Sequence, residues 1–496
     1  MAVKVDTQKE IIFGSSDPNI SRVISKKKKD GELRKLAPRI YTTNLIDSPA
    51  NIVRRNLIEI LAYRYPNALI SHRSAKEMRP TSTGDFFLTN STTRRVTDLP
   101  GIILNFVKGP KATAHDIPFM GIHISGEHRY MLENMQLSRK SGDESRVLPI
   151  SVIENKLEQL LLTGGEERLT QYRDELREVA NELGMADEFS KINNIISALL
   201  STHDARVLST DSAKARASGN PFDANRVGLF EILFDTIKDR YFVIRNNRNT
   251  DEDSFRLFSF FESYFSNYIE GTEFDIEEAK EIVDSGIPMP RRDEDSHDIL
   301  GTFKILSNRT EMRRVPTSPE ELFAILSHRH TILLEGRPHM NPGVFKMRNN
   351  RAGQTEFVDY QLVKGTLSQG FKYYSALTDP FARAIFMMFM ISEVHPFNDG
   401  NGRIARVMMN AEFVRADQSR IIVPTVFRED YILALRKLTR HKDPMAYINV
   451  MTKLHQFSDN LYGSDFTELK NYLAACNAYE EPSQAKLQII DRSIRH

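Results

Sequence analysis

The spacing of apolar side chains divides the chain into a mixed N-terminal half and a helical C-terminal half. In the first 205 residues, strand-like runs such as GIILNFVKG (101–109) precede helix-like runs such as ISVIENKLEQLLL (150–162). Over 224–460, apolar residues recur every three or four positions, interrupted by a loop-and-strand stretch at 335–370. This pattern predicts a mainly α fold, preceded by a mixed α/β region.

The same pattern predicts how the chain is divided into domains. A helix around Ile20 and Ile24, a short segment over 33–43 that leads into a β-wing, and a second helix capped by Asp47 or Ser48 indicate a winged-helix-like start. A segment rich in Ser, Ala, Gly and Asp lacks periodicity and is typical of a linker. The predicted parts are a winged-helix-like domain (1–60), a mixed α+β region (61–205), the linker (206–223), a helical domain (224–460) and a C-terminal helical tail (461–496).

Composition narrows the class of protein. The 67 basic and 66 acidic side chains nearly cancel, so no global field favours nucleic acid or a membrane as the main partner. The single cysteine, Cys476, excludes an intramolecular disulfide framework. The chain start resembles no secretory signal, and no apolar run has the roughly 18 residues that a membrane span needs. A cytoplasmic enzyme or regulator is therefore expected.

One short stretch, HPFNDGNGRIAR (395–406), concentrates the chemistry. The helical spacing of FARAIFMMFMISEVH (381–395) predicts a buried helix that ends at His395. The residues of 398–402 are turn formers, and RIARVMMNAEFVRA (403–416) resumes helical spacing. The prediction is a helix, a tight loop and a second helix.

Each polar residue of this stretch suits the handling of phosphate. The backbone N–H groups of Gly400, Asn401 and Gly402 begin a helix and form an anion site. Arg403 and Arg406, three residues apart, share a face of that helix and can bind successive phosphates. The candidate metal ligand is Asp399, a hard oxygen ligand of the kind that Mg²⁺ prefers, and His395 is the candidate proton acceptor. A lone histidine at a helix end is usually structural, so it is the combination that favours catalysis.

HPFNDGNGRIAR resembles the signature of the Fic (filamentation induced by cAMP) family at every specified position. The resemblance implies a small helical domain and transfer of AMP from ATP, with Mg²⁺ as cofactor, to a Ser, Thr or Tyr hydroxyl of a target protein. It makes His395 the base, Asp399 the Mg²⁺ ligand, positions 400–402 the anion hole, and Arg403 and Arg406 the clamp for the β- and γ-phosphates. Family members that phosphorylate their targets carry Lys at the place of Gly402, so Gly402 favours adenylylation. Asn410, on the second helix, is a candidate for the adenine pocket.

A second resemblance concerns regulation. Ser266, Glu270 and Gly271 in FFESYFSNYIEGTEF match the family's inhibitory pattern, placed before the catalytic stretch. The resemblance implies that Glu270 lies against Arg406, occupies the fork that the γ-phosphate needs, and serves in removal of AMP from the target. The alternative is an ordinary helix end, with Gly271 as the residue after the cap.

Residues 341–365 match the family's flap, a β-hairpin that holds the target segment. Alternating Phe357, Val358 and Tyr360 support a strand, and main-chain pairing with an extended peptide would position the target hydroxyl. An ordinary surface hairpin is the alternative.

The N-terminal half resembles AbiEi-type antitoxins and related winged-helix regulators in GELRKLAPRIYTTN (31–44) and YPNALISHRSA (65–75). That resemblance implies DNA binding through residues 1–60, where KKKK (26–29) can contact phosphates. A protein-recognition module is the alternative, and the sequence leaves open whether the chain forms a homo-oligomer. The second class of function is thus a nucleotide-sensing, DNA-binding regulator, which would need the phosphate clamp but not His395.

Overall fold

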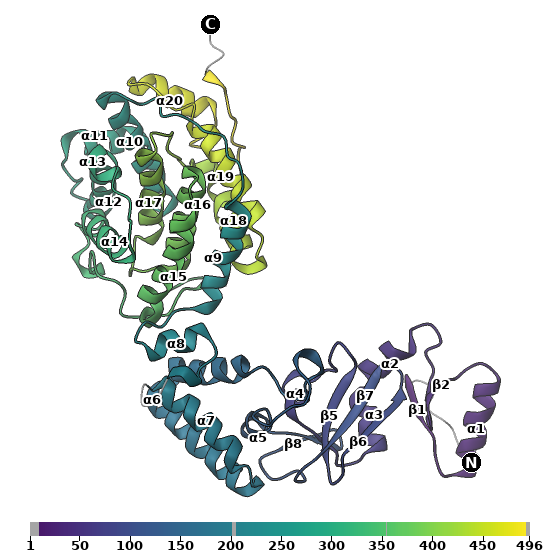
Figure 1. Cartoon of the computed structure of the whole chain (residues 1–496). Coiled ribbons are helices and arrows are strands. Elements are labelled where there is room, and N and C mark those ends of the chain that lie inside the picture. The colour runs from purple at the N-terminus through teal and green to yellow at the C-terminus, as the bar shows by residue number, and fades with distance from the viewer. Residues whose placement is uncertain (1–8, 201–204, 354, 493–496) are drawn as a thin grey trace. The chain divides into compact units, whose positions relative to one another are not determined.

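The computed structural model describes residues 9–200, 205–353 and 355–492, which form two compact units (Figure 1). Unit 1 comprises residues 1–218 and unit 2 comprises residues 219–496. No helix of the described residues is long and apolar enough to cross a membrane.

Unit 1 begins with a three-stranded antiparallel sheet of order β1-β3-β2. Helix α1 begins where the Asp17 side chain accepts the Asn19 N–H, and it ends in four lysines that favour the helix C-terminus. The predicted cap at Ser48 is confirmed, since its side chain accepts the Asn51 N–H. The elements are β1 (Ile11–Phe13), α1 (Pro18–Lys29), β2 (Arg34–Ala37), β3 (Ile40–Thr42), α2 (Pro49–Arg55) and α3 (Leu57–Arg64).

A six-stranded mixed sheet of order β6-β7-β5-β4-β9-β8 follows. β5 pairs with β7 in parallel, as β4 does with β9, and the other pairs are antiparallel. The strands are β4 (Leu69–Ile70), β5 (Asp85–Asn90), β6 (Arg94–Leu99), β7 (Ile102–Lys108), β8 (Ile117–Phe119) and β9 (Ile122–Ile124). The helices of this part are α4 (His72–Glu77), α5 (Glu127–Glu133), α6 (Ile150–Leu183), α7 (Ala186–Leu199) and α8 (Asp211–Ala217).

The predicted linker (206–223) contains the boundary between the two units, at Ser218/Gly219, but part of it is helical and packed. Residues 211–217 form α8, whose buried Ser212 donates to Glu158 of α6 at 3.0 Å, and Leu208 is also buried. The small side chains of this segment weaken the hydrophobic periodicity of the sequence. Two of them, Ser212 and Ala213, are the buried residues of α8. The predicted boundary near residue 60 has no counterpart, because one apolar core runs from Ile11 to Ala213.

Unit 2 is a helical domain in which α16 and α17 lie side by side at the centre, surrounded by the other helices (Figure 1). α16 is enclosed on every side here, since each residue of the consecutive run from Phe386 to Ile391 is fully buried. The helices are α9 (Ala224–Ile237), α10 (Glu252–Ile269), α11 (Ile276–Ser285), α12 (Asp293–Leu306), α13 (Arg309–Met312), α14 (Pro319–Leu333), α15 (Val363–Ala376), α16 (Pro380–Val394), α17 (Asn401–Arg415), α18 (Arg428–His441), α19 (Pro444–Ser458) and α20 (Phe466–Ala475).

Two predictions in unit 2 need correction. Over its described residues (461–492) the C-terminal tail is helical only in α20. Residues 478–490 form no regular helix and fold back toward α20, where the Tyr472 hydroxyl donates to Ile490 O. The hairpin of 341–365 is confined to β10 (Arg351–Ala352) and β11 (Thr355–Glu356), which pair antiparallel. The end of that stretch, from Val363 on, already belongs to α15. This start of the helix was not predicted from the sequence, because turn-forming residues lie next to it.

Candidate active site

The predicted helix–loop–helix is confirmed around the motif. α16 ends at Val394, His395 follows in the left-handed region at φ 52°, and Gly400 begins α17 at φ 70°. The loop therefore reverses direction at two positive-φ residues, of which only Gly400 adopts that conformation without strain.

The orientation of His395 is fixed on two sides. Its Nδ1 lies 3.2 Å from the carbonyl oxygen of Ser392, an acceptor, so Nδ1 carries the proton and Nε2 has its lone pair free. The ring stacks on Phe357, with centroids 3.5 Å apart and planes 3° apart. Burial lowers the pKa of His395 to about 4, despite the hydrogen bond to Ser392, so the ring is neutral at physiological pH. Nε2 can therefore accept a proton.

The N-terminus of α17 is an open anion site. Gly400 caps it without any side-chain hydrogen bond from the described residues, which leaves the first-turn N–H groups unsatisfied. A Cβ at position 402 would overlap Glu270 Oε1, so a carboxylate already approaches this helix end closely.

Arg406 holds that carboxylate, as predicted. Its Nη2 lies 2.7 Å from Glu270 Oε1, and its Nε donates to Ser266 Oγ at 2.9 Å. The Arg406 side chain is buried, whereas 34% of the Glu270 side chain is exposed. The ion pair is thus open to solvent on the side of the carboxylate.

Arg403 has a partner that the sequence did not indicate. Its Nη1 lies 2.8 Å from Asp298 Oδ2, and Asp298 also accepts from Arg337 Nη2 at 2.8 Å. Arg403 Nε is buried with no hydrogen-bond partner among the described residues. An unsatisfied buried donor beside an anion site is suited to a phosphate oxygen.

Asp399 can hold a metal ion that a nucleotide also coordinates. Its side chain is 42% exposed, and its nearest cation, Arg403 Nη2, is 3.7 Å away. The described residues include no group of three or more His, Cys, Asp or Glu that could bind a metal. A single carboxylate fits Mg²⁺, which usually takes one or two carboxylates and completes its shell with water and phosphate oxygens.

The motif loop is tied down by side chains outside the motif. Buried Lys346 donates its backbone N–H to Pro396 O at 2.8 Å, and the Asn350 amide donates to Phe397 O at 2.8 Å. The Asn401 side chain bonds both the N–H and the carbonyl of Phe397 at 2.8 Å. In the predicted anion hole, Asn401 therefore offers its backbone N–H only.

The prediction of Asn410 as an adenine-pocket residue is wrong. Its amide donates to Glu262 Oε1 at 2.6 Å and to Ile421 O at 2.8 Å, and its oxygen accepts the Ile421 N–H. Asn410 is fully buried and ties the segment after α17 to α10.

The helix that carries Glu270 is held on two faces. On one face, Ser259 and Ser263 donate to carbonyl oxygens of α12, at Leu306 and Ile299. On another, Tyr479 stacks on Phe265, with centroids 5.4 Å apart. Glu270 caps α10 and Gly271 follows at φ 93°, so the ordinary helix end and the contact with Arg406 coexist.

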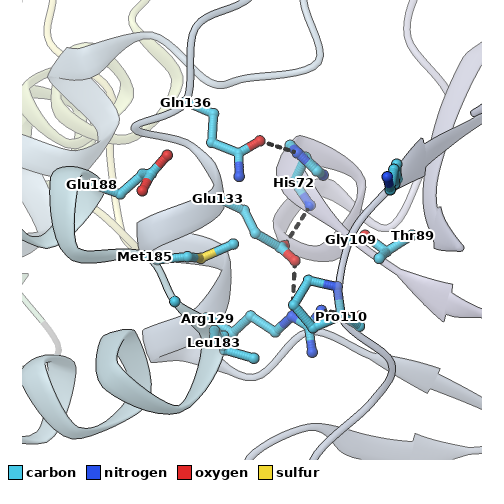
Figure 2. A pocket seen from close by; sticks show the side chains of 12 residues that line it. His72, Thr89, Gly109, Pro110, Arg129, Glu133, Gln136, Leu183, Met185 and Glu188 are labelled. Carbon is cyan, nitrogen blue, oxygen red and sulfur yellow. Dashed lines mark hydrogen bonds and ion pairs between the residues drawn. The ribbon is translucent and has the colours of Figure 1, made fainter. Parts of the chain in front are cut away.

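Unit 1 contains a polar pocket of its own, with a volume of about 190 Å³ (Figure 2). Arg129 is fully buried there and pairs with Glu133 at 2.9 Å and Asp116 at 2.8 Å. Glu133 also accepts the His72 N–H at 2.9 Å, and His72 Nε2 faces Gln136 Oε1 at 3.1 Å. This network was not predicted from the sequence, because no motif marks its members and His72 lies 61 residues from Glu133.

Comparisons with known proteins match the catalytic region. Residues 318–412 match the sequence profile of the Fic/DOC family. The chain is 30% identical over 115 residues to the protein adenylyltransferase fic-1 of Caenorhabditis elegans, a match that covers 23% of this chain and 22% of that protein. It is 24% identical over 214 residues to the protein adenylyltransferase Fic of Nematostella vectensis, covering 40% and 47%. The chain thus spans less than half the length of these two curated relatives.

Solved structures of Fic proteins are also similar, but distantly. A structure of C. elegans Fic-1 has a TM-score of 0.36 and 17% identity, and the match covers 66% of this chain and 92% of that one. The resemblance of the catalytic region to Fic proteins is confirmed by the family match. The resemblance of the N-terminal half to AbiEi-type antitoxins stays a prediction, as do DNA binding through residues 1–60 and self-association.

Proposed function

We propose that this chain, which contains a Fic/DOC domain, transfers AMP from ATP to a hydroxyl side chain of a target protein. The observation that carries the proposal is a neutral His395, with Nε2 free, beside the open N-terminus of α17 and Arg406. A base next to an anion site is what attack by a hydroxyl on a phosphate requires. Similarity to protein adenylyltransferases supports AMP as the transferred group.

The reaction follows from these groups. The target hydroxyl oxygen attacks the α-phosphorus and a new P–O bond forms, while its proton passes to His395 Nε2. The bond between the α-phosphorus and the bridging oxygen breaks, and pyrophosphate leaves. Arg406 and the α17 N–H groups hold the β- and γ-phosphates, and Arg403 Nε supplies a further donor. Mg²⁺ held by Asp399 would neutralise charge on the phosphates.

The target segment would dock on the short hairpin of β10 and β11. Its two strands are exposed, and Phe357, which follows β11, already contacts His395. An extended peptide paired with the hairpin would bring its Ser, Thr or Tyr hydroxyl to Nε2.

Glu270 would restrain the reaction. A guanidinium fork that binds a carboxylate at 2.7 Å is not available to the γ-phosphate. ATP that binds beside Glu270 would then hold its α-phosphate out of line with the hydroxyl. Glu270 would also orient a water for removal of AMP from the target, a role that its carboxylate near the anion site supports.

Label transfer tests the proposal. The chain would be incubated with host lysate and each of ATP, GTP, CTP and UTP carrying α-³²P, and labelled proteins would be identified by mass spectrometry. We expect label from ATP, carried as AMP on a hydroxyl side chain. The control is His395→Ala, which should lose about 10²- to 10⁴-fold in rate while ATP still binds. Transfer at the normal rate by this variant would remove His395 from the mechanism.

A further inference from the structure

His330, on α14, connects two segments that meet at the motif loop. Gly343 donates its backbone N–H to His330 Nδ1 at 2.8 Å, and His330 Nε2 lies 3.0 Å from the Asp399 backbone oxygen. The ring stacks on Phe397, with centroids 3.7 Å apart and planes 6° apart. His330 is fully buried.

Only one protonation state of His330 satisfies both partners. A backbone N–H can only donate, so Nδ1 must be the acceptor for Gly343. A carbonyl oxygen can only accept, so Nε2 must carry the proton and donate it to Asp399. The two partners therefore select the neutral ring with its hydrogen on Nε2.

The direction of the Asp399 carboxylate depends on the backbone around it. Its side chain is 42% exposed and its contact with Arg403, at 3.7 Å, is too long for a hydrogen bond. The next residue, Gly400, has φ 70°, a left-handed conformation that glycine adopts without strain. Within the described residues, the hydrogen bond from His330 is the one that holds the Asp399 backbone.

We propose that His330 is a positioning residue for the metal site: its Nε2–H holds the Asp399 backbone and so aims the carboxylate at a divalent cation bound with ATP. The proposal rests on the proposed function, in which Asp399 holds Mg²⁺. Through Gly343, His330 also ties Asp399 to the start of the segment that leads to the hairpin. Gly343 is itself fixed there, because at φ 80° a Cβ would overlap Thr331 Oγ1.

Two substitutions separate the two hydrogen bonds of His330. The amide of His330→Asn lies where Nδ1 is, so its oxygen can accept from Gly343 but nothing reaches Asp399. The longer His330→Gln places its amide where Nε2 is, so its NH₂ can donate to Asp399. Both remove the imidazole, and they differ in which bond they keep.

Metal affinity measures the proposed effect without relying on catalysis. Mn²⁺ would be titrated, with a non-hydrolysable ATP analogue present, into the full chain carrying Glu270→Gly, and free Mn²⁺ followed by electron paramagnetic resonance. Loss of a partner that orients a metal ligand typically costs 10- to 100-fold in affinity. We expect His330→Asn to raise the Kd for Mn²⁺ about 10-fold, and His330→Gln about two- to threefold or less.

Asp399→Ala separates failure of the proposal from failure of its premise. If Asp399→Ala leaves the Mn²⁺ affinity unchanged, the metal site of the proposed function is wrong. If Asp399→Ala weakens binding but His330→Asn binds like its parent, the positioning role of His330 is wrong.

The unmutated side chain supplies a second test, which holds even if His330→Asn fails to fold. In the chain labelled with ¹⁵N-histidine, the signals absent from His330→Gln belong to His330. We expect the proton on Nε2, with a pyridine-like Nδ1 shift. A proton on Nδ1 would overturn the proposal, since Nε2 could then donate nothing to Asp399.

Discussion

Each unit of the chain buries an arginine against carboxylates, and the two arrangements differ in what can replace the carboxylate. In unit 1, Arg129 and Glu133 (Figure 2) and Asp116 have fully buried side chains. Arg129 also donates to the carbonyl oxygens of Pro110 and Lys111. In unit 2, Arg406 is buried but Glu270 is one-third exposed, beside free helix N–H groups.

The difference separates a structural network from an exchangeable one. An anion that replaces Glu133 would have to satisfy His72 and Ser125 as well as Arg129, inside the fold. An anion that replaces Glu270 needs only to satisfy Arg406 and the start of α17, from the solvent side. Exposure of one partner, rather than ion-pair distance, marks the site where a ligand can compete.

The largest expected effect comes from removing Arg406, the arginine whose carboxylate partner can be exchanged for a ligand. In a Glu270→Gly background, Arg406→Ala should reduce AMP transfer by about 10³-fold, because the phosphate clamp itself is lost. Initial rates of label transfer measure this loss. The double variant should match Arg406→Ala alone, since the two residues act on one contact; additive effects would contradict a shared contact.

Removing the carboxylate of Glu270 should raise the rate of AMP transfer instead of lowering it. Glu270→Gly should raise transfer, including self-modification, about 100-fold, because ATP regains in-line geometry. Ser266→Ala, which removes a neighbouring contact of Arg406 but keeps the carboxylate, is the matched control and should change the rate far less. Equal initial rates for wild type and Glu270→Gly would sink the inhibitory role.

Loss of the arginine should lower the free energy of unfolding more in unit 1 than in unit 2. Arg129→Met leaves two buried carboxylates unpaired and should destabilise unit 1 by about 3–5 kcal/mol. Arg406→Met leaves Glu270, which can turn to water, and should cost unit 2 about 1 kcal/mol. Native-state hydrogen exchange followed by mass spectrometry reports each unit separately. Similar losses in the two units would remove the distinction drawn between the networks.

The smallest expected effect is on the pH dependence. With a pKa of about 4, His395 is neutral throughout pH 5 to 7 and takes up a proton only as the pH falls through about 4. Single-turnover rates of Glu270→Gly should therefore be nearly flat from pH 7 to 5 and fall below that. A midpoint near 6.5 would show that the ring is more exposed in the working enzyme than in this structure.

The sequence predicted most accurately where the signal was local. The end of α16, the turn and the start of α17 follow from residues that are neighbours in the chain, and so does the cap at Ser48. The contact between Glu270 and Arg406 was predicted through a family pattern, since 136 residues separate the pair.

What the sequence did not predict depends on contacts between distant segments. Asp298, which pairs with Arg403, lies in α12 after an acidic first turn (Asp293, Glu294 and Asp295), and nothing local distinguishes it from those carboxylates. His330 precedes Asp399 by 69 residues and has no motif around it. Asn410 was misassigned because an amide on a catalytic helix suggests a ligand contact, whereas its partners on α10 and at Ile421 are visible only in three dimensions.

The stacking of Phe357 on His395 has a consequence for the entropy of the reaction. A free imidazole rotates about two bonds, and fixing it costs roughly 1 kcal/mol or less in conformational entropy. Here the ring is already immobilised, by one aromatic neighbour and one hydrogen bond, before a target arrives. The entropy of the ring is therefore lost when the domain folds and not when the target binds. The binding energy of a docking peptide is then available to position its own hydroxyl in line with the α-phosphorus.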